Sequence, residues 1–176
     1  GRQIDSYEGL FYTCAENFEK KGARISLETT VDNIDFGKKV VYGTKKNGEK
    51  FEESYDKLVL ATGSLPISPA LPGNELEGLK FLKLFQEGQA VDKEISNPDV
   101  KEVAVIGAGY IGVEIAEACL LRGKKVRLFD IAPSSLASYY DEWFTEDMDK
   151  AISDAGIETH FGEKVLEYKG NGRVSS

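Results

Sequence analysis

The chain has 176 residues, of which 41% are hydrophobic, a share typical of a globular protein with a real core. Its 22 basic and 30 acidic side chains give a formal net charge of -8. This charge argues against partners that need a basic surface, such as nucleic acid or an anionic membrane. No apolar run approaches the roughly 20 residues of a membrane helix, so we expect a cytoplasmic protein. Two distant cysteines, Cys14 and Cys119, and one histidine, His160, argue against a redox pair, a disulfide framework or a zinc site.

The first part of the chain predicts a helix followed by an antiparallel sheet. Apolar residues recur at three- and four-residue spacing from Tyr7 to Lys20, which predicts a helix ended by Gly22. Asn47-Gly48 favours a tight hairpin turn. Strand patterns occupy Arg24 to Glu28, Val31 to Phe36, Val40 to Thr44 and Lys50 to Ser54. We therefore expect a small antiparallel meander.

A buried strand and a proline-rich connector come next. Residues 55–61 become continuously apolar, which predicts a strand covered on both faces and ending at Thr62-Gly63-Ser64. Residues 65–73 hold three prolines, which cannot continue a strand ladder and stiffen a connector. An amphipathic stretch from Leu79 to Ile95 predicts a bridging helix.

Strands and helices then alternate along the chain. The expected elements are strand 102–106, helix 110–122, strand 125–130, helix 141–155 and strand 157–161. This order predicts parallel βαβ units. The fold class is therefore α/β, with a Rossmann-like βαβ unit and an antiparallel β-meander. The expected divisions of the chain are residues 1–73, a linker with the bridging helix at 74–100, and residues 101–176.

Three glycines mark the junction between strand 102–106 and its helix. Gly107, Gly109 and Gly112 are spaced G-x-G-x-x-G, and each costs about 0.5–1 kcal/mol relative to alanine in regular structure. The first glycine would permit a tight turn, the second would let a pyrophosphate approach, and the third would let the helix pack closely. The free N–H groups at the helix start would bind the pyrophosphate. A plain strand, turn and helix is the alternative.

Asp130 favours the dinucleotide interpretation. It ends the next strand about 20 residues beyond Gly109, a spacing typical of such sites. A carboxylate there accepts hydrogen bonds from the adenosine ribose hydroxyls, whereas it would repel a 2′-phosphate at about 4 Å by a few kcal/mol. We therefore expect NADH to be preferred over NADPH, with Arg127 on the opposite face of the strand.

Four segments carry a resemblance to a known family. They are Glu8 to Tyr12, Tyr55 to Pro66, Val105 to Glu114 and Leu136 to Asp141. With them the sequence resembles the flavin-dependent, water-forming NADH oxidases of the pyridine nucleotide-disulfide oxidoreductase superfamily, close to NADH peroxidases and coenzyme A disulfide reductases. The resemblance covers essentially the whole chain, and the last two segments are fairly specific to the oxidase and peroxidase group.

The resemblance implies binding sites for FAD and NAD(H). Residues 1–73 would be the C-terminal part of the first FAD-binding segment, which contains the meander, and residues 101–176 a truncated NAD-binding Rossmann domain. It implies FAD contacts at Val31, Ala61, Thr62, Gly63, Ser64 and Lys83. It implies NAD contacts at Gly107, Gly109, Tyr110, Ile111, Gly112, Glu114, Asp130 and Tyr139. Tyr110 would be a gate over the flavin where nicotinamide docks, with a core aromatic as the alternative. Glu114 would hold the nicotinamide end or be a solvated helix carboxylate, and Tyr139 would border the adenine.

The implied activity is hydride transfer from NADH to FAD and reduction of oxygen to water through one cysteine that forms a sulfenic acid. That cysteine is expected upstream of Gly1, so the chain contains no catalytic residue and is expected to be an inactive piece of a longer homo-oligomeric protein. Its partners would be NADH and oxygen or peroxide, without nucleic acid, membrane or metal. Two alternatives stay open: an NADH peroxidase or coenzyme A disulfide reductase, and a non-catalytic NADH-binding module.

Overall fold

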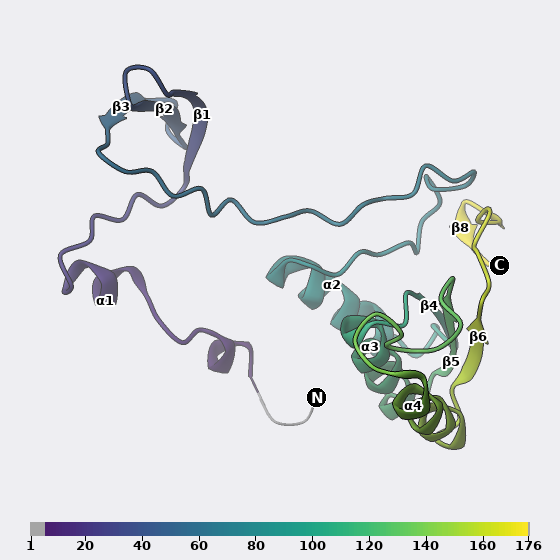
Figure 1. Cartoon of the computed structure of the whole chain (residues 1–176). Helices are drawn as coiled ribbons and strands as arrows, with labels where there is room; N and C mark the ends of the chain where they lie inside the picture. The colour runs from purple at the N-terminus through teal and green to yellow at the C-terminus, as the bar shows by residue number, and fades with distance from the viewer. Residues whose placement is uncertain (1–5, 176) are drawn as a thin grey trace. The chain divides into compact units, whose positions relative to one another are not determined.

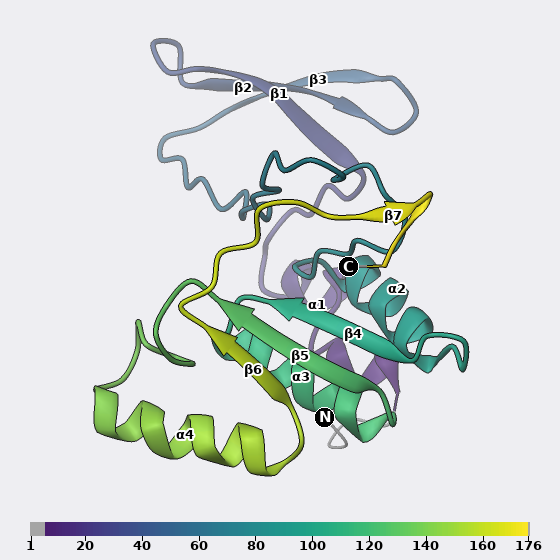
Figure 2. The ribbon, with the colours of Figure 1, turned by 90° about the vertical axis from the view of Figure 1, so that its right-hand side faces the viewer.

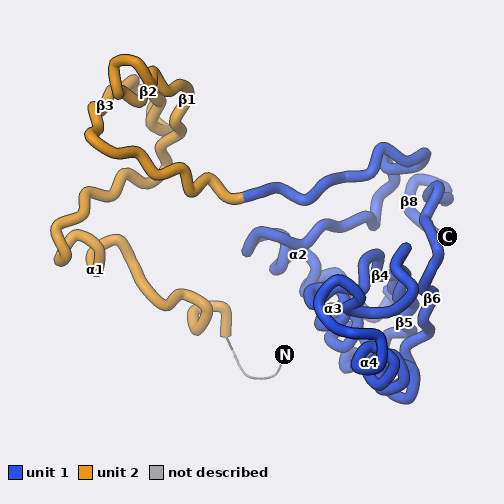
Figure 3. The backbone as a smooth tube through the Cα atoms, viewed as in Figure 1, with its two compact units in different colours: residues 1, 64–176 blue, residues 2–63 orange. Residues whose placement is uncertain are grey.

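The structure is a computed structural model that describes residues 6–175 (Figure 1). The described residues form two compact units, residues 6–63 and residues 64–175, which Figure 3 colours separately. Each unit has its own sheet of three strands. The domain limits that the sequence predicts stay predictions.

Residues 6–63 contain the predicted antiparallel meander. The strands are β1 (Thr29–Asp35), β2 (Val40–Lys45) and β3 (Lys50–Ser54), paired in that order. Val40 is paired with Asp35 on one side and with Ser54 on the other, and a bulge interrupts β1 between Val31 and Asn33. Gly48 turns the hairpin between β2 and β3 with φ of +86°. The meander prediction is therefore confirmed.

The segments on either side of the meander differ from expectation. The predicted helix from Tyr7 to Lys20 is replaced by a short 3-10 helix, η1 (Tyr7–Leu10), and a one-turn helix, α1 (Ala15–Glu19). Phe11 is 62% exposed between them. Because an amphipathic helix gains its stability from packing its apolar face, these residues do not sustain a long helix here. The strand predicted at Arg24 to Glu28 is also irregular.

The strand predicted at residues 55–61 is absent. Val59 and Leu60 are 84% and 61% exposed, and no described strand is paired with this segment. A strand that is apolar on both faces depends on neighbouring strands and on covering layers. The sequence pattern alone therefore predicted a strand that this unit does not provide with partners.

Residues 64–175 fold around a parallel sheet in the order β4-β5-β6 (Figure 2). Helices α3 and α4 pack against this sheet. The elements are α2 (Phe85–Ser96), β4 (Glu102–Ile106), α3 (Tyr110–Leu121), β5 (Lys125–Asp130), α4 (Glu142–Asp154) and β6 (Glu158–Phe161), followed by β7 (Gly170–Asn171) and β8 (Arg173–Val174). This confirms the predicted α/β class and the alternating strands and helices.

The core of this unit lies between the sheet and its helices. It is formed by Ile95, Val105, Ala108, Ala116, Cys119, Val126, Leu128, Ile152 and Ile157. Cys119 is fully buried in this core, and its burial raises the pKa of the thiol. Cys14 is instead exposed. No helix within residues 6–175 is long and apolar enough to cross a membrane.

Helix α2 begins later than the sequence predicts. The Glu87 carboxylate accepts the N–H groups of Lys83 at 2.7 Å and Leu84 at 2.8 Å, and the helix starts at Phe85. A glutamate at the third helical position that bonds back in this way fixes a helix start. Lys83, which was expected on the bridging helix, therefore lies just before it.

The connector that precedes α2 is bonded to the C-terminal segment. The N–H of Tyr168 donates to the carbonyl oxygen of Pro72 at 2.8 Å, and the N–H of Glu77 donates to that of Gly172 at 3.0 Å. Arg173 forms an ion pair with Glu94 of α2. Main-chain hydrogen bonds between segments so far apart in the chain leave no periodic pattern in the sequence. These bonds were therefore not predicted.

Candidate dinucleotide-binding site

The turn between β4 and α3 contains two glycines that the backbone requires. Gly107 has φ of +104°, a conformation that L side chains rarely adopt, and its N–H donates to the carbonyl oxygen of Phe129 at 2.8 Å. A Cβ on Gly112 would lie 1.7 Å from the carbonyl oxygen of Gly107. The tight turn and the close approach of helix to strand, expected of the first and third glycines, are both present.

Gly109 has neither of these reasons to be glycine. Its φ is -77°, and the nearest atom to a Cβ built there is Cε2 of Tyr139, at 3.9 Å. No atom of the residues that the structure describes would clash with an alanine side chain at this position. With no Cβ here, the Tyr139 ring is the one described side chain near this stretch of main chain. Close approach of a ligand to the main chain is the role expected of the second glycine of the motif.

The start of α3 offers hydrogen-bond donors to that ligand. Gly109 is the N-cap of the helix and provides no side-chain cap, and no acidic residue occupies the first turn. Val113 is the first residue whose N–H bonds back, to the carbonyl oxygen of Gly109 at 3.0 Å. The preceding N–H groups therefore point outward at the positive end of the helix dipole, an arrangement that binds phosphate groups.

Asp130 turns its carboxylate toward the same turn. Its Oδ2 accepts the N–H of Ala108 at 2.6 Å, and its Oδ1 accepts the N–H of Ala132 at 2.8 Å. These bonds fix the carboxylate at the end of β5, where it is half-buried. A carboxylate has about four acceptor positions, so two remain for the hydroxyl groups of a ligand.

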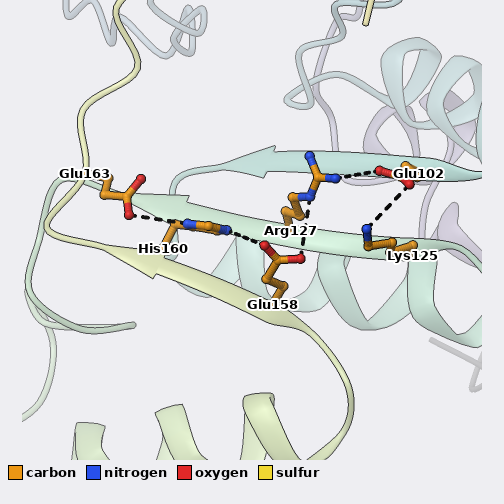
Figure 4. A network of polar contacts seen from close by, with 6 residues as sticks. All are labelled: Glu102, Lys125, Arg127, Glu158, His160 and Glu163. Carbon is orange, nitrogen blue, oxygen red and sulfur yellow. Dashed lines mark hydrogen bonds and ion pairs between the residues drawn. The ribbon is translucent and has the colours of Figure 1, made fainter. Parts of the chain in front are cut away.

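Arg127 lies on the opposite face of β5, as expected. Its guanidinium donates to Glu102 at 2.8 Å and lies 3.6 Å from Glu158, on the face of the sheet turned away from α3 (Figure 4). It therefore places no positive charge beside Asp130. A 2′-phosphate at Asp130 would meet the carboxylate without this arginine as a counter-charge.

His160 belongs to the same charged face. It stacks on Phe129 with ring centroids 4.5 Å apart, and its two ring nitrogens lie 2.9 Å from Glu158 and 3.3 Å from Glu163. The hydrogen bond to Glu158 is the main cause that raises the pKa of His160. The histidine is therefore a packing and pairing residue rather than part of the glycine turn.

Three tyrosines gather beside the glycine turn. The rings of Tyr110 and Tyr139 have centroids 4.6 Å apart, and the Tyr110 hydroxyl donates to that of Tyr140 at 2.6 Å. This hydrogen bond is the main cause that raises the pKa of Tyr110. All three side chains are about half exposed. Tyr110 and Tyr139, expected at opposite ends of NADH, thus contact one another.

A cavity of about 250 Å³ opens next to these rings. It is lined by Tyr110, Val113, Glu114, Leu136, Tyr140, Phe144, Thr145 and Met148. Glu114 is exposed at this cavity one turn into α3, and Ile111 is 56% exposed on the same helix. Tyr110 and Glu114 therefore line the same cavity, and their contacts with NAD stay predictions.

The residues expected to contact FAD lie in both units. Val31 lies on β1 and is 52% exposed, and Ala61, Thr62 and Gly63 lie in the irregular segment after the meander. Ser64 and Lys83 belong to the other unit. The FAD contacts therefore stay predictions, with the correction that Ala61 ends no strand.

The segment between β5 and the tyrosines was not expected to be fixed so closely to the glycine turn. Leu136 has φ of +53°, is 5% exposed, and donates its N–H to the carbonyl oxygen of Ala108 at 2.9 Å. The N–H of Ser135 donates to Asp149 of α4 at 2.9 Å. Tyr140 was missed as a functional candidate, although it stands directly beside Tyr139 in the sequence.

The fold and the turn together define a Rossmann-type dinucleotide-binding unit. Residues 3–176 match the model of the pyridine nucleotide-disulphide oxidoreductase family, and the chain belongs to that family. The sequence is 58% identical to an NADH oxidase of Lactococcus lactis subsp. cremoris over 171 residues, which cover 97% of this chain and 38% of that protein.

Solved structures of two similar proteins carry bound nucleotide. A water-forming NADH oxidase from Lactobacillus brevis, bound to NADH, superimposes with a TM-score of 0.87 at 34% identity, covering 96% of this chain and 37% of that one. An engineered five-substitution variant of that enzyme, a water-forming NADPH oxidase bound to NADPH, gives a TM-score of 0.85 at 33% identity, covering 95% of this chain and 37% of that one. The chain thus spans less than two fifths of the length of these relatives.

Proposed function

We propose that this chain is the NADH-binding part, together with a piece of the FAD-binding part, of a water-forming NADH oxidase. Gly109 is the observation that carries the proposal. Neither strain nor crowding requires glycine there, since the Tyr139 ring is all that a Cβ would touch among the described residues, and uncapped N–H groups follow it. The similarity to NADH oxidases supports the same reading.

Asp130 supports NADH rather than NADPH as the substrate. Its carboxylate faces the glycine turn, and Arg127 is engaged on the other face of the strand. The engineered NADPH oxidase replaces a glycine and an aspartate that are as far apart as Gly112 and Asp130, and it introduces two arginines. Removing a carboxylate and adding positive charge is the change expected to admit a 2′-phosphate.

Exposed apolar side chains support a contact of this chain with FAD. Val59, Leu60 and Leu65 are between 61% and 84% exposed around Ala61 to Ser64. Large apolar side chains that stay exposed indicate a segment that a ligand or another part of the protein covers. Bound FAD would accept the hydride and supply the chemistry that reduces oxygen.

The residues of the chain itself would bind and orient the nucleotide. The N–H groups at the start of α3 would hold the pyrophosphate, and Asp130 would accept the hydroxyl groups of the adenosine ribose. Tyr139 would border the adenine, while Tyr110 and Glu114 would form the nicotinamide end beside the cavity. Ile111 would contact the nucleotide from the exposed side of the same helix turn.

The test is the stoichiometry of the full-length protein. After reconstitution with FAD, a water-forming oxidase consumes two molecules of NADH per molecule of oxygen and leaves no peroxide. A ratio of one with peroxide accumulating would contradict water formation, and a colourless protein that takes up no flavin would contradict the flavoenzyme. NADH oxidation that requires added peroxide or a disulfide would instead establish the peroxidase or coenzyme A disulfide reductase alternative. NADH binding without oxidation would establish the non-catalytic module.

A further inference from the structure

The ring of Tyr139 occupies the space through which a pyrophosphate would reach the glycine turn. Its Cε2 lies 3.9 Å from the position that a Cβ of Gly109 would take, which is ordinary van der Waals contact. The ring is 58% exposed, so little covers it from outside. A dinucleotide laid over Gly109 must therefore displace this ring.

Tyr139 is held in that place by the neighbouring tyrosine of α3. The Tyr110 ring lies 4.6 Å from the Tyr139 ring at an angle of 56°, a favourable aromatic contact. The N–H groups of Tyr139 and Tyr140 both donate to the carbonyl oxygen of Leu136, at 2.8 and 3.3 Å. The main chain of this turn is thereby fixed by hydrogen bonds, whereas the Tyr139 ring is held by an aromatic contact.

Tyr140 completes the arrangement from the other side. Its hydroxyl accepts the Tyr110 hydroxyl at 2.6 Å, and its ring packs against Phe144 of α4 with centroids 6.4 Å apart. The Tyr110 and Tyr140 rings meet edge to face, 6.2 Å apart. Both line the cavity that Glu114 also lines. The Tyr110 ring is thus bonded to Tyr140, which in turn contacts α4 through the Phe144 ring.

We propose that Tyr140 is a positioning residue for NADH binding: its hydroxyl holds the Tyr110 ring, and through it the Tyr139 ring, over the glycine turn until NADH enters. The inference rests on the function proposed above and names a residue that the resemblance did not assign. Binding of NADH must break the hydrogen bond between the two hydroxyls, so this bond lowers the apparent affinity. A net hydrogen bond of ordinary strength corresponds to about a two- to tenfold change in a dissociation constant.

The test uses Tyr140→Phe and Tyr110→Phe in the full-length, FAD-loaded protein. Each variant keeps the ring and removes one side of the same hydrogen bond. NAD⁺, which cannot reduce the flavin, is titrated by calorimetry, and NADH is followed by anaerobic flavin reduction in a stopped-flow instrument. Both variants are expected to bind about two to ten times more tightly than wild type, and the double variant no more tightly than either one. The limiting rate of flavin reduction should stay unchanged in Tyr140→Phe.

Tyr168→Phe is the matched control, because its ring lies in the C-terminal segment outside the tyrosine cluster, and it should bind like wild type. Unchanged or weaker binding by Tyr140→Phe would overturn the proposal, as would additive effects of the two substitutions. In that case wild-type binding of NADH would leave the proposed function standing. If the wild type binds neither nucleotide, both the proposed function and the role of Tyr140 fall.

Discussion

Substituting Gly109 by alanine should separate ligand binding from folding. The φ of -77° suits alanine, and the nearest atom to the new Cβ is 3.9 Å away. The free energy of unfolding should therefore not fall, and it can rise by about 0.4–1 kcal/mol because alanine restricts the unfolded chain. Binding should suffer, because the Cβ would stand where the pyrophosphate approaches. Losing one hydrogen bond to a charged group costs about 1.5–3 kcal/mol, which weakens NADH binding by roughly 10- to 100-fold.

Gly112→Ala is the matched comparison. Its Cβ would lie 1.7 Å from the carbonyl oxygen of Gly107 and 2.8 Å from the carbonyl carbon. The turn and α3 must separate to admit it, and overpacking of this kind costs about 1–3 kcal/mol of stability. The structure thus predicts that Gly109→Ala weakens nucleotide binding, whereas Gly112→Ala lowers the free energy of unfolding.

Both variants should be made in the full-length protein. Thermal and denaturant unfolding report stability, and calorimetric titration with NAD⁺ reports affinity. Gly109→Ala with wild-type affinity would refute the assignment of the pyrophosphate to this turn. Gly109→Ala with lowered stability would refute the open geometry on which the assignment depends.

Three further changes test other parts of the account. Asp130→Ala should lower the ratio of NADPH to NADH dissociation constants at least tenfold, since repulsion of a 2′-phosphate is worth a few kcal/mol; an unchanged ratio would contradict the role of this carboxylate. The hydrogen bond to Glu158 raises the pKa of His160. The stability that this bond contributes is therefore complete below the usual histidine pKa of about 6.5, and it is lost as the pH rises through the higher pKa of the folded state. The difference in unfolding free energy between wild type and His160→Gln should therefore shrink from about pH 6 to pH 8, and a pH-independent difference would exclude this coupling. Lys124 is 8% exposed and donates to the carbonyl oxygens of Asn97 and Val100, each at 2.8 Å; Lys124→Met should cost about 1–3 kcal/mol in denaturant unfolding, and no loss would contradict this anchoring.

The parallel sheet could be predicted because its signals are local and agree with one another. Strand β4, the glycine turn and α3 follow in one continuous stretch, and β5 pairs directly with β4. Asp130 ends β5 beside the turn because neighbouring parallel strands end at the same edge. Apolar patterning, helix starts and strand ends therefore all pointed to the same unit.

Features that depend on distant partners could not be predicted in the same way. Residues 55–61 have the composition of a buried strand, yet no described strand is paired with them. The start of α2 depends on how Glu87 bonds to the preceding main chain. The rings of Tyr110 and Tyr139 are in contact, although Tyr110 precedes β5 in the sequence and Tyr139 follows it. The spacing of these residues along the sequence does not predict this contact.

Binding of NADH at the glycine turn is tested most directly by the structure of the full-length, FAD-loaded protein with NADH bound under anaerobic conditions. We expect the pyrophosphate over Gly109 within hydrogen-bond distance of the N–H groups that begin α3, and the adenosine ribose hydroxyls on the Asp130 carboxylate. We also expect the Tyr139 ring to leave its present place over the turn. Nucleotide bound elsewhere, with the turn still covered by Tyr139 and Asp130 bonded only to the main chain, would contradict it.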